Sequence, residues 1–262
     1  MPSSALQVAR TGLEAQDTRM RVIANNLANV STTAFKRDRA NFETLAYQDA
    51  RVAGAQSSSE TAYATGLNLG TGVGVQSTSR METQGTLQST SNSLDLALDG
   101  DGYFQVALPG GQLAYTRAGN FSRSAEGQLV TSQGYPVQPA ITIPEGATSI
   151  TISTDGTVSA QLSGQSEPSQ LGQITIASFT NAAGLQSSSD NFMLETAASG
   201  PAQIGVAGED GRGQIRQGML EASNVSIVEE LVDMIEAQRS YEINSKMISA
   251  VDEMLKNANQ TL

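Results

Sequence analysis

The chain has 262 residues, a formal net charge of −11, and neither histidine nor cysteine. Without histidine it lacks the commonest general base and metal ligand, and without cysteine it can form no disulfide, thiolate nucleophile or ordinary structural zinc site. Nucleic acid is also disfavoured as a partner, because phosphate binding needs clustered Lys and Arg, and neither occurs between Arg123 and Arg212. The sequence therefore predicts no cofactor, no metal site and no nucleic-acid partner.

No membrane segment or secretory leader is expected. The N-terminus has no early basic run followed by a long apolar stretch, which is the pattern of a signal peptide. Nor does any window approach the roughly 20 apolar residues that a membrane-spanning helix requires. We expect no membrane insertion, and either a cytosolic location or export by a route that reads no cleavable signal.

Both ends of the chain are predicted helices, the first from Ser3 to about Val30 and the second beginning after a cap at Ser223 or Asn224. In each, apolar residues recur at spacings of three and four, the pattern of helices that pack side by side, and only Gln16 interrupts the N-terminal stripe. On the C-terminal helix a partly overlapping stripe runs through Met247, Val251, Met254 and Ala258. Because such a helix is only marginally stable alone in water, each end needs a partner. We predict an assembly interface made of Leu6, Leu13, Met20, Ile23, Leu27, Val30, Ile227, Leu231, Met234, Tyr241, Ile248 and Leu255.

Charge favours pairing of the two ends with each other. The N-terminal segment is net basic through Arg39, and the C-terminal segment is net acidic from Glu221 onward. Opposite charges beside a heptad stripe favour pairing of unlike helices and set their orientation. The alternative is that both sets of charges only solvate the outer faces of the helices.

Between Gln48 and Gly74 the composition shifts to Ser, Ala, Gln, Gly and Thr, with weak helix and strand signals, which indicates an extended arm or linker. Its end, Gly66–Gly74, superficially resembles a phosphate loop. It lacks the Gly-Lys-Ser/Thr ending and the strand–loop–helix context, so we interpret it as a glycine-rich return of the arm.

The middle of the chain is predicted to be β structure. From about Ser91 the apolar period changes to two, and the Pro109-Gly110-Gly111 turn separates two strand-like runs, 103–108 and 112–117. Asp155-Gly156 is a second hairpin signal. Further strands are expected at 128–131, 149–153, 157–161 and 173–179. The predicted fold class is α+β: terminal helices in a coiled-coil-like inner domain, an inserted sandwich- or barrel-like all-β domain, and an extended arm. The predicted boundaries are 1–36 (N-terminal helix), 37–75 (arm), 76–218 (β domain) and 219–262 (C-terminal helix).

Asp95, Asp99 and Asp101 form the only constellation here that suggests chemistry. Asp–Gly loops can hold calcium, and paired carboxylates can cleave glycosidic bonds, so a calcium-binding module and an enzyme acting on cell-wall glycan are both rival readings. No Glu follows at the calcium-loop spacing. We favour a tight turn in which Gly supplies positive φ and Asp bonds the backbone, and we predict no catalytic residues.

Several motifs together resemble one known family. The run 22–30, Val-Ile-Ala-Asn-Asn-Leu-Ala-Asn-Val, followed by Ser-Thr-Thr-Ala-Phe-Lys-Arg at 31–37, is similar to the N-terminal signature of bacterial flagellar rod and hook axial proteins. The segments 100–106, 115–121, 218–225 and 237–242 resemble the family's β-domain and C-terminal motifs. The family commonly has Gly before the Phe, whereas this chain has Ala34, from which we expect that the turn does not need positive φ.

The resemblance implies a structural, non-enzymatic subunit that polymerises helically, and the length and the arm favour the distal rod branch of the family. It implies a rigid drive shaft from motor to hook, located in the basal body from periplasm to outer membrane. The implied partners are other copies, the proximal rod and hook-side axial proteins, the P- and L-ring bushing, and the flagellar type III export apparatus. A proximal rod paralogue and a non-axial carbohydrate- or calcium-binding β module are the alternatives.

A rod must not bend as it turns, whereas a hook must. Because the arm is the obvious extra part, we predict that it stiffens the shaft by docking on a neighbouring subunit. The alternative is a passive solvent-exposed loop. The predicted arm contacts are Tyr47, Tyr63, Leu67, Leu69 and Val73.

Overall fold

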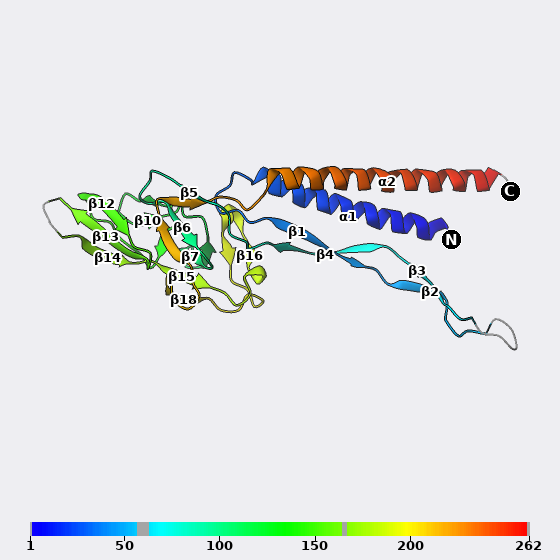
Figure 1. Cartoon of the computed structure of the whole chain (residues 1–262), viewed down its shortest axis with the longest axis horizontal. Helices are drawn as coiled ribbons and strands as arrows, with labels where there is room; N and C mark the ends of the chain where they lie inside the picture. The colour runs from blue at the N-terminus through cyan, green and yellow to red at the C-terminus, as the bar shows by residue number, and fades with distance from the viewer. Residues whose placement is uncertain (1, 57–62, 164–166, 261–262) are drawn as a thin grey trace. The chain divides into compact units, whose positions relative to one another are not determined.

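The computed structural model describes residues 2–56, 63–163 and 167–260 (Figure 1). The chain forms two compact units. The helix–arm unit comprises residues 1–28, 38–79 and 226–262, and the β unit comprises residues 29–37 and 80–225. Terminal helices and a strand-rich middle confirm the predicted α+β class.

In the helix–arm unit, α1 (Pro2–Ala28) and α2 (Ile227–Gln260) lie side by side (Figure 1). The residues that α1 buries most deeply include the small Ala9 and Ala15, and α2 buries Ala237. Small side chains let two helix backbones approach closely. Arg19 of α1 also pairs with Asp233 and Glu236 of α2, each at 3.3 Å, so the two ends pair within one chain as their charges predict.

The second helix begins at Ile227, so Ser226 precedes it at the N-cap position and its carbonyl accepts from Glu230 N at 3.0 Å. The predicted cap at Ser223 or Asn224 is therefore wrong. Asn224 has a different task in the β unit, where its side chain accepts from Arg37 N at 2.7 Å and donates to the carbonyl oxygens of Met81 and Thr83. A short polar side chain before a helix can bind either the helix or a neighbouring strand, and the sequence alone does not decide between them.

The arm is a β ribbon, which its composition indicated only weakly. β1 (Asp38–Thr44) pairs with β4 (Val73–Arg80), and β2 (Tyr47–Arg51) pairs antiparallel with β3 (Leu67–Gly70) (Figure 1). Val73 N donates to Thr11 Oγ1 of α1 at 3.4 Å, and Gly72, with φ of +123°, leaves no room for a Cβ atom beside that hydroxyl. The ribbon therefore contacts its own N-terminal helix at this glycine.

The β unit is built of short strands. Its largest sheet has the order β16-β17-β8-β7-β15-β18, with β11 also paired to β7, and a three-stranded sheet has the order β12-β13-β14. The remaining pairs are β9 with β10, β6 with β19 and β5 with β20. The strands are β5 (Leu87–Ser89), β6 (Leu96–Asp99), β7 (Tyr103–Ala107), β8 (Leu113–Thr116), β9 (Ser122–Arg123), β10 (Leu129–Val130), β11 (Val137–Gln138), β12 (Ala147–Ile152), β13 (Thr157–Leu162), β14 (Ser169–Gln173), β15 (Thr175–Ser178), β16 (Gln186–Ser187), β17 (Met193–Leu194), β18 (Gln203–Val206), β19 (Gln214–Gln217) and β20 (Met219–Glu221). Two 3₁₀ turns, η1 (Ala182–Gly184) and η2 (Ser189–Asn191), complete it.

One main core fills the β unit. It contains Phe104 of β7, Ile176 of β15 and Ile215 of β19, all fully buried. The Phe104 and Phe121 rings meet edge to face with centroids 5.1 Å apart. Both predicted hairpins are confirmed: β7 and β8 flank the turn at 109–111, and β12 and β13 flank Asp155-Gly156, where Gly156 has φ of +87°.

Candidate assembly site

The predicted helix stripes are only partly covered within the chain. On the N-terminal side Ile23 is buried, whereas Leu6, Leu13, Met20, Leu27 and Val30 are half-buried. On α2, Met234, Tyr241, Ile248 and Leu255 are half-buried, and Ile227 and Leu231 are exposed. The α1–α2 contact thus relies on small and polar residues and leaves most of the larger apolar side chains accessible.

A row of exposed apolar side chains on α2 was predicted only in part. Val228 is 72% exposed and Val232 is 60% exposed, on a helix whose first turn also carries Glu229 and Glu230. The further large apolar side chains exposed on α2 are Ile235, Ile243, Met247 and Met254. These side chains recur at spacings of three, four and seven, and Met247 and Met254 also lie on the overlapping stripe that the sequence predicts. Exposed apolar faces of this extent mark interaction surfaces.

Polar groups pin the α1–α2 contact near the end of α1. Asn26 and Glu230 are almost fully buried, and Asn26 Nδ2 donates to Glu230 Oε2 at 3.3 Å. The same Asn26 side chain donates to Asp38 O and accepts from Asp38 N, both at 2.9 Å. A buried polar contact in a helix pair fixes which residues face each other. Sequence reasoning missed this pair because Asn26 lies off the apolar stripe.

The predicted arm contacts are mostly exposed. Tyr47, Tyr63, Leu67 and Leu69 present their side chains to solvent, while Val73 is half-buried beside Thr11. The Arg51 guanidinium stacks over the Tyr63 ring, 4.1 Å from its centroid. The tip between these residues, 57–62, lies outside the described residues. An isolated two-stranded ribbon is only marginally stable in water. This ribbon therefore needs further contacts, and its exposed apolar side chains could make them.

In the β unit, a buried charged cluster joins distant parts of the chain. Glu221 accepts from Lys36 Nζ at 2.6 Å and from Arg117 Nε at 3.0 Å, and all three side chains are nearly inaccessible to solvent. Burial, and next the positive charge of Arg117, lower the pKa of Lys36. Nearby, the Tyr103 hydroxyl donates to Glu82 at 2.9 Å, and burial, then the Glu82 carboxylate, raise the pKa of Tyr103.

The turn that carries Lys36 corrects one expectation. Ala34 has φ of +56°, so the turn does need positive φ. In this turn Ala34 N donates to Glu221 O at 2.8 Å, so the backbone here is held against the last strand of the β unit. The neighbouring Thr33 carbonyl accepts from Asn191 Nδ2 at 3.0 Å.

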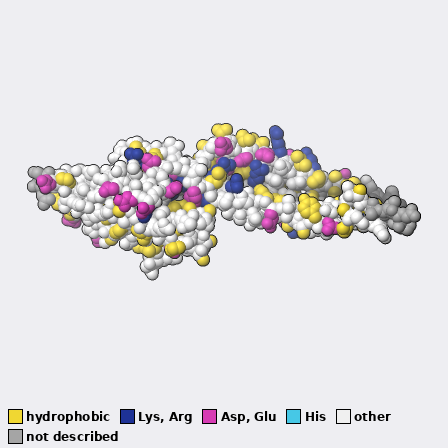
Figure 2. Space-filling view, turned by 60° about the horizontal axis from the view of Figure 1, so that its bottom comes forward, with side chains coloured by type: hydrophobic (Ala, Val, Ile, Leu, Met, Phe, Trp, Pro, Cys, Tyr) yellow, Lys and Arg dark blue, Asp and Glu magenta, His cyan; other side chains and the backbone are white. Residues whose placement is uncertain are grey.

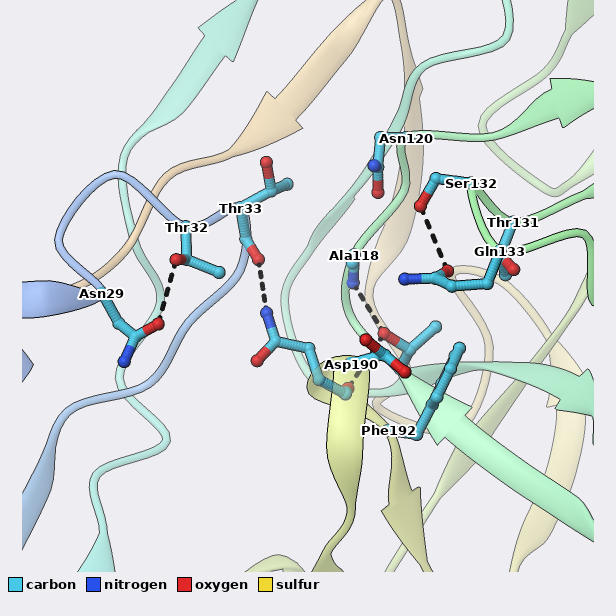
Figure 3. A pocket seen from close by; sticks show the side chains of 12 residues that line it. Asn29, Thr32, Thr33, Ala118, Asn120, Thr131, Ser132, Gln133, Asp190 and Phe192 are labelled. Atoms are coloured by element: carbon cyan, nitrogen blue, oxygen red, sulfur yellow. Dashed lines mark hydrogen bonds between the residues drawn. The ribbon is translucent and has the colours of Figure 1, made fainter. Parts of the chain in front are cut away.

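A polar pocket of about 410 Å³ opens beside this turn (Figure 3). Hydroxyl and amide side chains dominate its wall, with one carboxylate from Asp190 and one aromatic ring from Phe192. Asp190 and Asn191 both have positive φ, and the Asn191 carbonyl accepts from Thr116 Oγ1 at 3.2 Å. The lining contains no basic side chain, so it does not suit phosphate.

Asp99 is the last residue of β6, and Asp95 and Asp101 form isolated β-bridges to Asn120 and Arg212. The Asp95 carboxylate accepts from Thr90 Oγ1 and Asn92 Nδ2, each at 2.8 Å, and Asp99 pairs with Arg216 at 3.1 Å. Gly100 and Gly102 have positive φ, as the turn reading expects. Across the described residues, acidic side chains gather nowhere in a group suited to a metal ion.

Acidic side chains are spread over the β unit on the face shown in Figure 2, with few basic ones among them. This follows from the stretch between Arg123 and Arg212, which has no Lys or Arg. Of the helices within the described residues, none has the length and apolar character needed to cross a membrane.

Known proteins match this chain along nearly its whole length. Residues 6–36 match the flagella basal body rod protein family, residues 97–160 the flagellar hook protein FlgE/F/G D1 domain, and residues 216–261 the flagellar basal body rod FlgEFG protein C-terminal family. The flagellar basal-body rod protein FlgG of Buchnera aphidicola (subsp. Acyrthosiphon pisum) is 50% identical over 98% of each chain. FlgG of Bacillus subtilis is 38% identical over 94% of each chain.

Two paralogues from one organism can be compared with this chain. The FlgG of Caulobacter vibrioides is 50% identical over 98% of each chain, whereas its FlgF is 33% identical over 92% of this chain and 90% of its own. This chain belongs to the FlgG family of flagellar basal-body rod proteins. It is a structural subunit of the distal rod, located in the flagellar basal body. Membership of the FlgG family makes the uncovered helix faces the natural place to look for subunit contacts.

Proposed function

We propose that the chain polymerises helically with copies of itself into a rigid drive shaft that transmits torque from motor to hook. The observation that carries this proposal is the uncovered apolar surface of both terminal helices. One chain covers its helix contact with small and polar residues, and its larger apolar side chains remain accessible. Identical contacts that do not close a ring generate a helical filament.

The predicted stripe residues are the proposed packing positions between copies, from Leu6 to Val30 on the N-terminal side and from Ile227 to Leu255 on α2. The exposed row of α2 at Val228, Val232 and Ile235 extends that surface. In this proposal the helical segments 1–36 and 219–262 form the inner layer, and the segment 76–218 forms the outer one. The axial partners are the proximal rod and hook-side proteins, whose subunits would meet the two ends of the shaft.

The arm, segment 37–75, is proposed to stiffen the shaft by docking along a neighbouring copy. Its exposed Tyr47, Tyr63, Leu67 and Leu69 support this, because these aromatic and aliphatic side chains keep much of their surface open to solvent on a thin ribbon. Val73 contributes in a different way, since it is half-buried where the ribbon meets α1.

Location and route are further parts of the proposal. The shaft would run from the periplasm to the outer membrane inside the P- and L-ring bushing, and the subunit would leave the cell through the flagellar type III export apparatus without a cleaved signal peptide. The role is mechanical, and we propose no enzymatic activity. An assay for sugars released from peptidoglycan tests this, and we expect no release.

The test is the shape of polymers grown from purified protein. Light scattering should show concentration-dependent assembly, and electron microscopy should show straight rods. Deleting Gln56–Gly66, part of which lies outside the described residues, should permit assembly but yield a more curved shaft with a shorter persistence length. A protein that stays monomeric at high concentration would contradict the polymer. Rods of unchanged straightness in the deletion would transfer the stiffening role to the β unit.

A further inference from the structure

Glu221 is the last charged residue of the β unit along the chain. It ends β20, the final strand of the chain, only a few residues before α2. The cations that it neutralises come from far earlier, since Lys36 lies 185 positions and Arg117 lies 104 positions before it. The buried cluster therefore stays incomplete until the end of this unit is in place.

Every polar atom of the Glu221 side chain has a partner from the earlier chain. Oε1 accepts from Lys36 Nζ at 2.6 Å and from Gly85 N at 2.9 Å, and Oε2 accepts from Arg117 Nε at 3.0 Å. Its carbonyl accepts from Ala34 N at 2.8 Å. The cations are also bound to backbone, Lys36 to Thr83 O and Arg117 to Gly100 O, so they are held in place by the strands themselves.

Without Glu221 these two cations would be buried together with their shared counter-charge missing. Removing one partner from a buried ion pair shifts the unfolding equilibrium by roughly a hundredfold to a thousandfold or more. That is a large share of the whole folding equilibrium of a typical domain. The same final segment also supplies Ile215, a fully buried core residue on β19, so an incomplete chain lacks core and counter-charge together.

We propose that Glu221 is the closing residue of the β unit, which reaches its full stability only when this carboxylate neutralises Lys36 and Arg117. A chain that leaves a narrow channel N-terminus first would then lack a stable β unit until its last strand has left the channel. For passage through the export channel this consequence rests on the proposed function, whereas the dependence of folding on Glu221 does not.

The experiment uses the full-length monomer in dilute solution, with urea unfolding followed by hydrogen exchange of amides in β7 and β13. Glu221→Gln should raise the unfolding constant of the β unit about a hundredfold or more. The matched control is Asp99→Asn, which neutralises a carboxylate of the half-exposed pair with Arg216 and should change the constant by less than about fivefold.

A second substitution separates charge closure from the loss of an ordinary contact. If unpaired cations are the cause, adding Lys36→Met to Glu221→Gln removes one of them and should recover stability by roughly tenfold. If the two residues only supply independent contacts, the double variant is less stable than either single one, and the proposal fails. It fails equally if the double variant is no more stable than Glu221→Gln, or if Glu221→Gln behaves like the control. Because the readout is monomer folding, loss of polymerisation alone would bear on the shaft and leave this inference standing.

Discussion

The two units differ in where they place their large apolar side chains, because one buries them and the other leaves them exposed. The β unit buries Phe104, Ile176 and Ile215 completely and so holds its own core. The helix–arm unit buries mainly small and polar residues, Ala9, Ala15 and Asn26 among them, and exposes valines, isoleucines and methionines on α2. Under the proposed function, stability and association would therefore lie in different parts of one chain. Substitutions in one unit should change folding, and substitutions in the other should change assembly.

The largest expected effect is the loss of assembly in Leu27→Asp. Leu27 is half-buried on the predicted stripe of α1, and a carboxylate there would be desolvated without a partner when copies pack. Light scattering and electron microscopy should show no polymer, while the melting transition of the β unit is almost unchanged. Ala24→Asp, at an exposed position on the same helix and off the stripe, should still assemble. Filaments of normal length in Leu27→Asp would place this residue outside any packed interface.

A matched pair of truncations should then separate folding in the two units. Phe104→Ala removes a fully buried ring from the β unit and should cost about 3–5 kcal/mol of unfolding free energy. Leu231→Ala removes an exposed side chain from α2 and should change the monomer's unfolding free energy by less than about 0.5 kcal/mol. Urea titration of the monomer measures both. Similar losses at the two positions would mean that α2 is already covered in the free chain.

Alkaline pH should destabilise the β unit through Tyr103. Its pKa is raised by burial and by Glu82, so the unfolded state releases this proton first. The stabilisation is complete below the unfolded pKa of about 10 and is lost as pH rises above it. The lowered pKa of Lys36 acts in the opposite direction, because stability rises as its buried charge is lost.

The comparison of the parent with Tyr103→Phe isolates the tyrosine, since both proteins keep Lys36. Between about pH 9 and about pH 11, the urea midpoint of the parent should fall more steeply than that of the variant. Equal slopes in the two proteins would show that the Tyr103 hydroxyl ionises as readily when folded as when unfolded.

The smallest expected effect is a gain in stability in Ala34→Gly. The left-handed conformation costs Ala roughly 1–2 kcal/mol, and the greater unfolded freedom of Gly offsets about 0.5–1 kcal/mol of that. A net gain of about 0.5–1 kcal/mol in the β unit should follow, measured by urea titration. Ala118→Gly, in the same unit but without positive φ, should instead lower stability. A loss of stability in Ala34→Gly would mean that its methyl group packs better than the strain costs.

The spacing of apolar residues and the turn residues predicted the elements that depend on local sequence. The change to period two found β6 and β7, and the glycine turns found the hairpins around 109–111 and Asp155-Gly156. The arm ribbon was not predicted as strands because Ser, Gly and Gln carry little β signal. Its pairing is a property of two segments together.

The candidate site was predicted only where one helix face carries the signal. The stripes indicated surfaces that need partners, and that reading stays a prediction. The exposed Val228, Val232 and Ile235 at the start of α2 were not predicted, because two faces of one helix overlap in sequence. The cluster of Lys36, Arg117 and Glu221 could not be found from spacing at all, since Glu221 lies more than a hundred positions from each of its two cations and nothing local marks a buried Glu.

Asn26 has a consequence for how load passes through the helix–arm unit. Its side-chain amide binds both the N–H and the C=O of Asp38, so the end of α1 is fastened directly to the start of β1. The covalent route between them runs through the whole turn 29–37. Force along the helix can therefore pass to the ribbon through these two hydrogen bonds, without stretching the turn. The arm and α1 can then act as one lever.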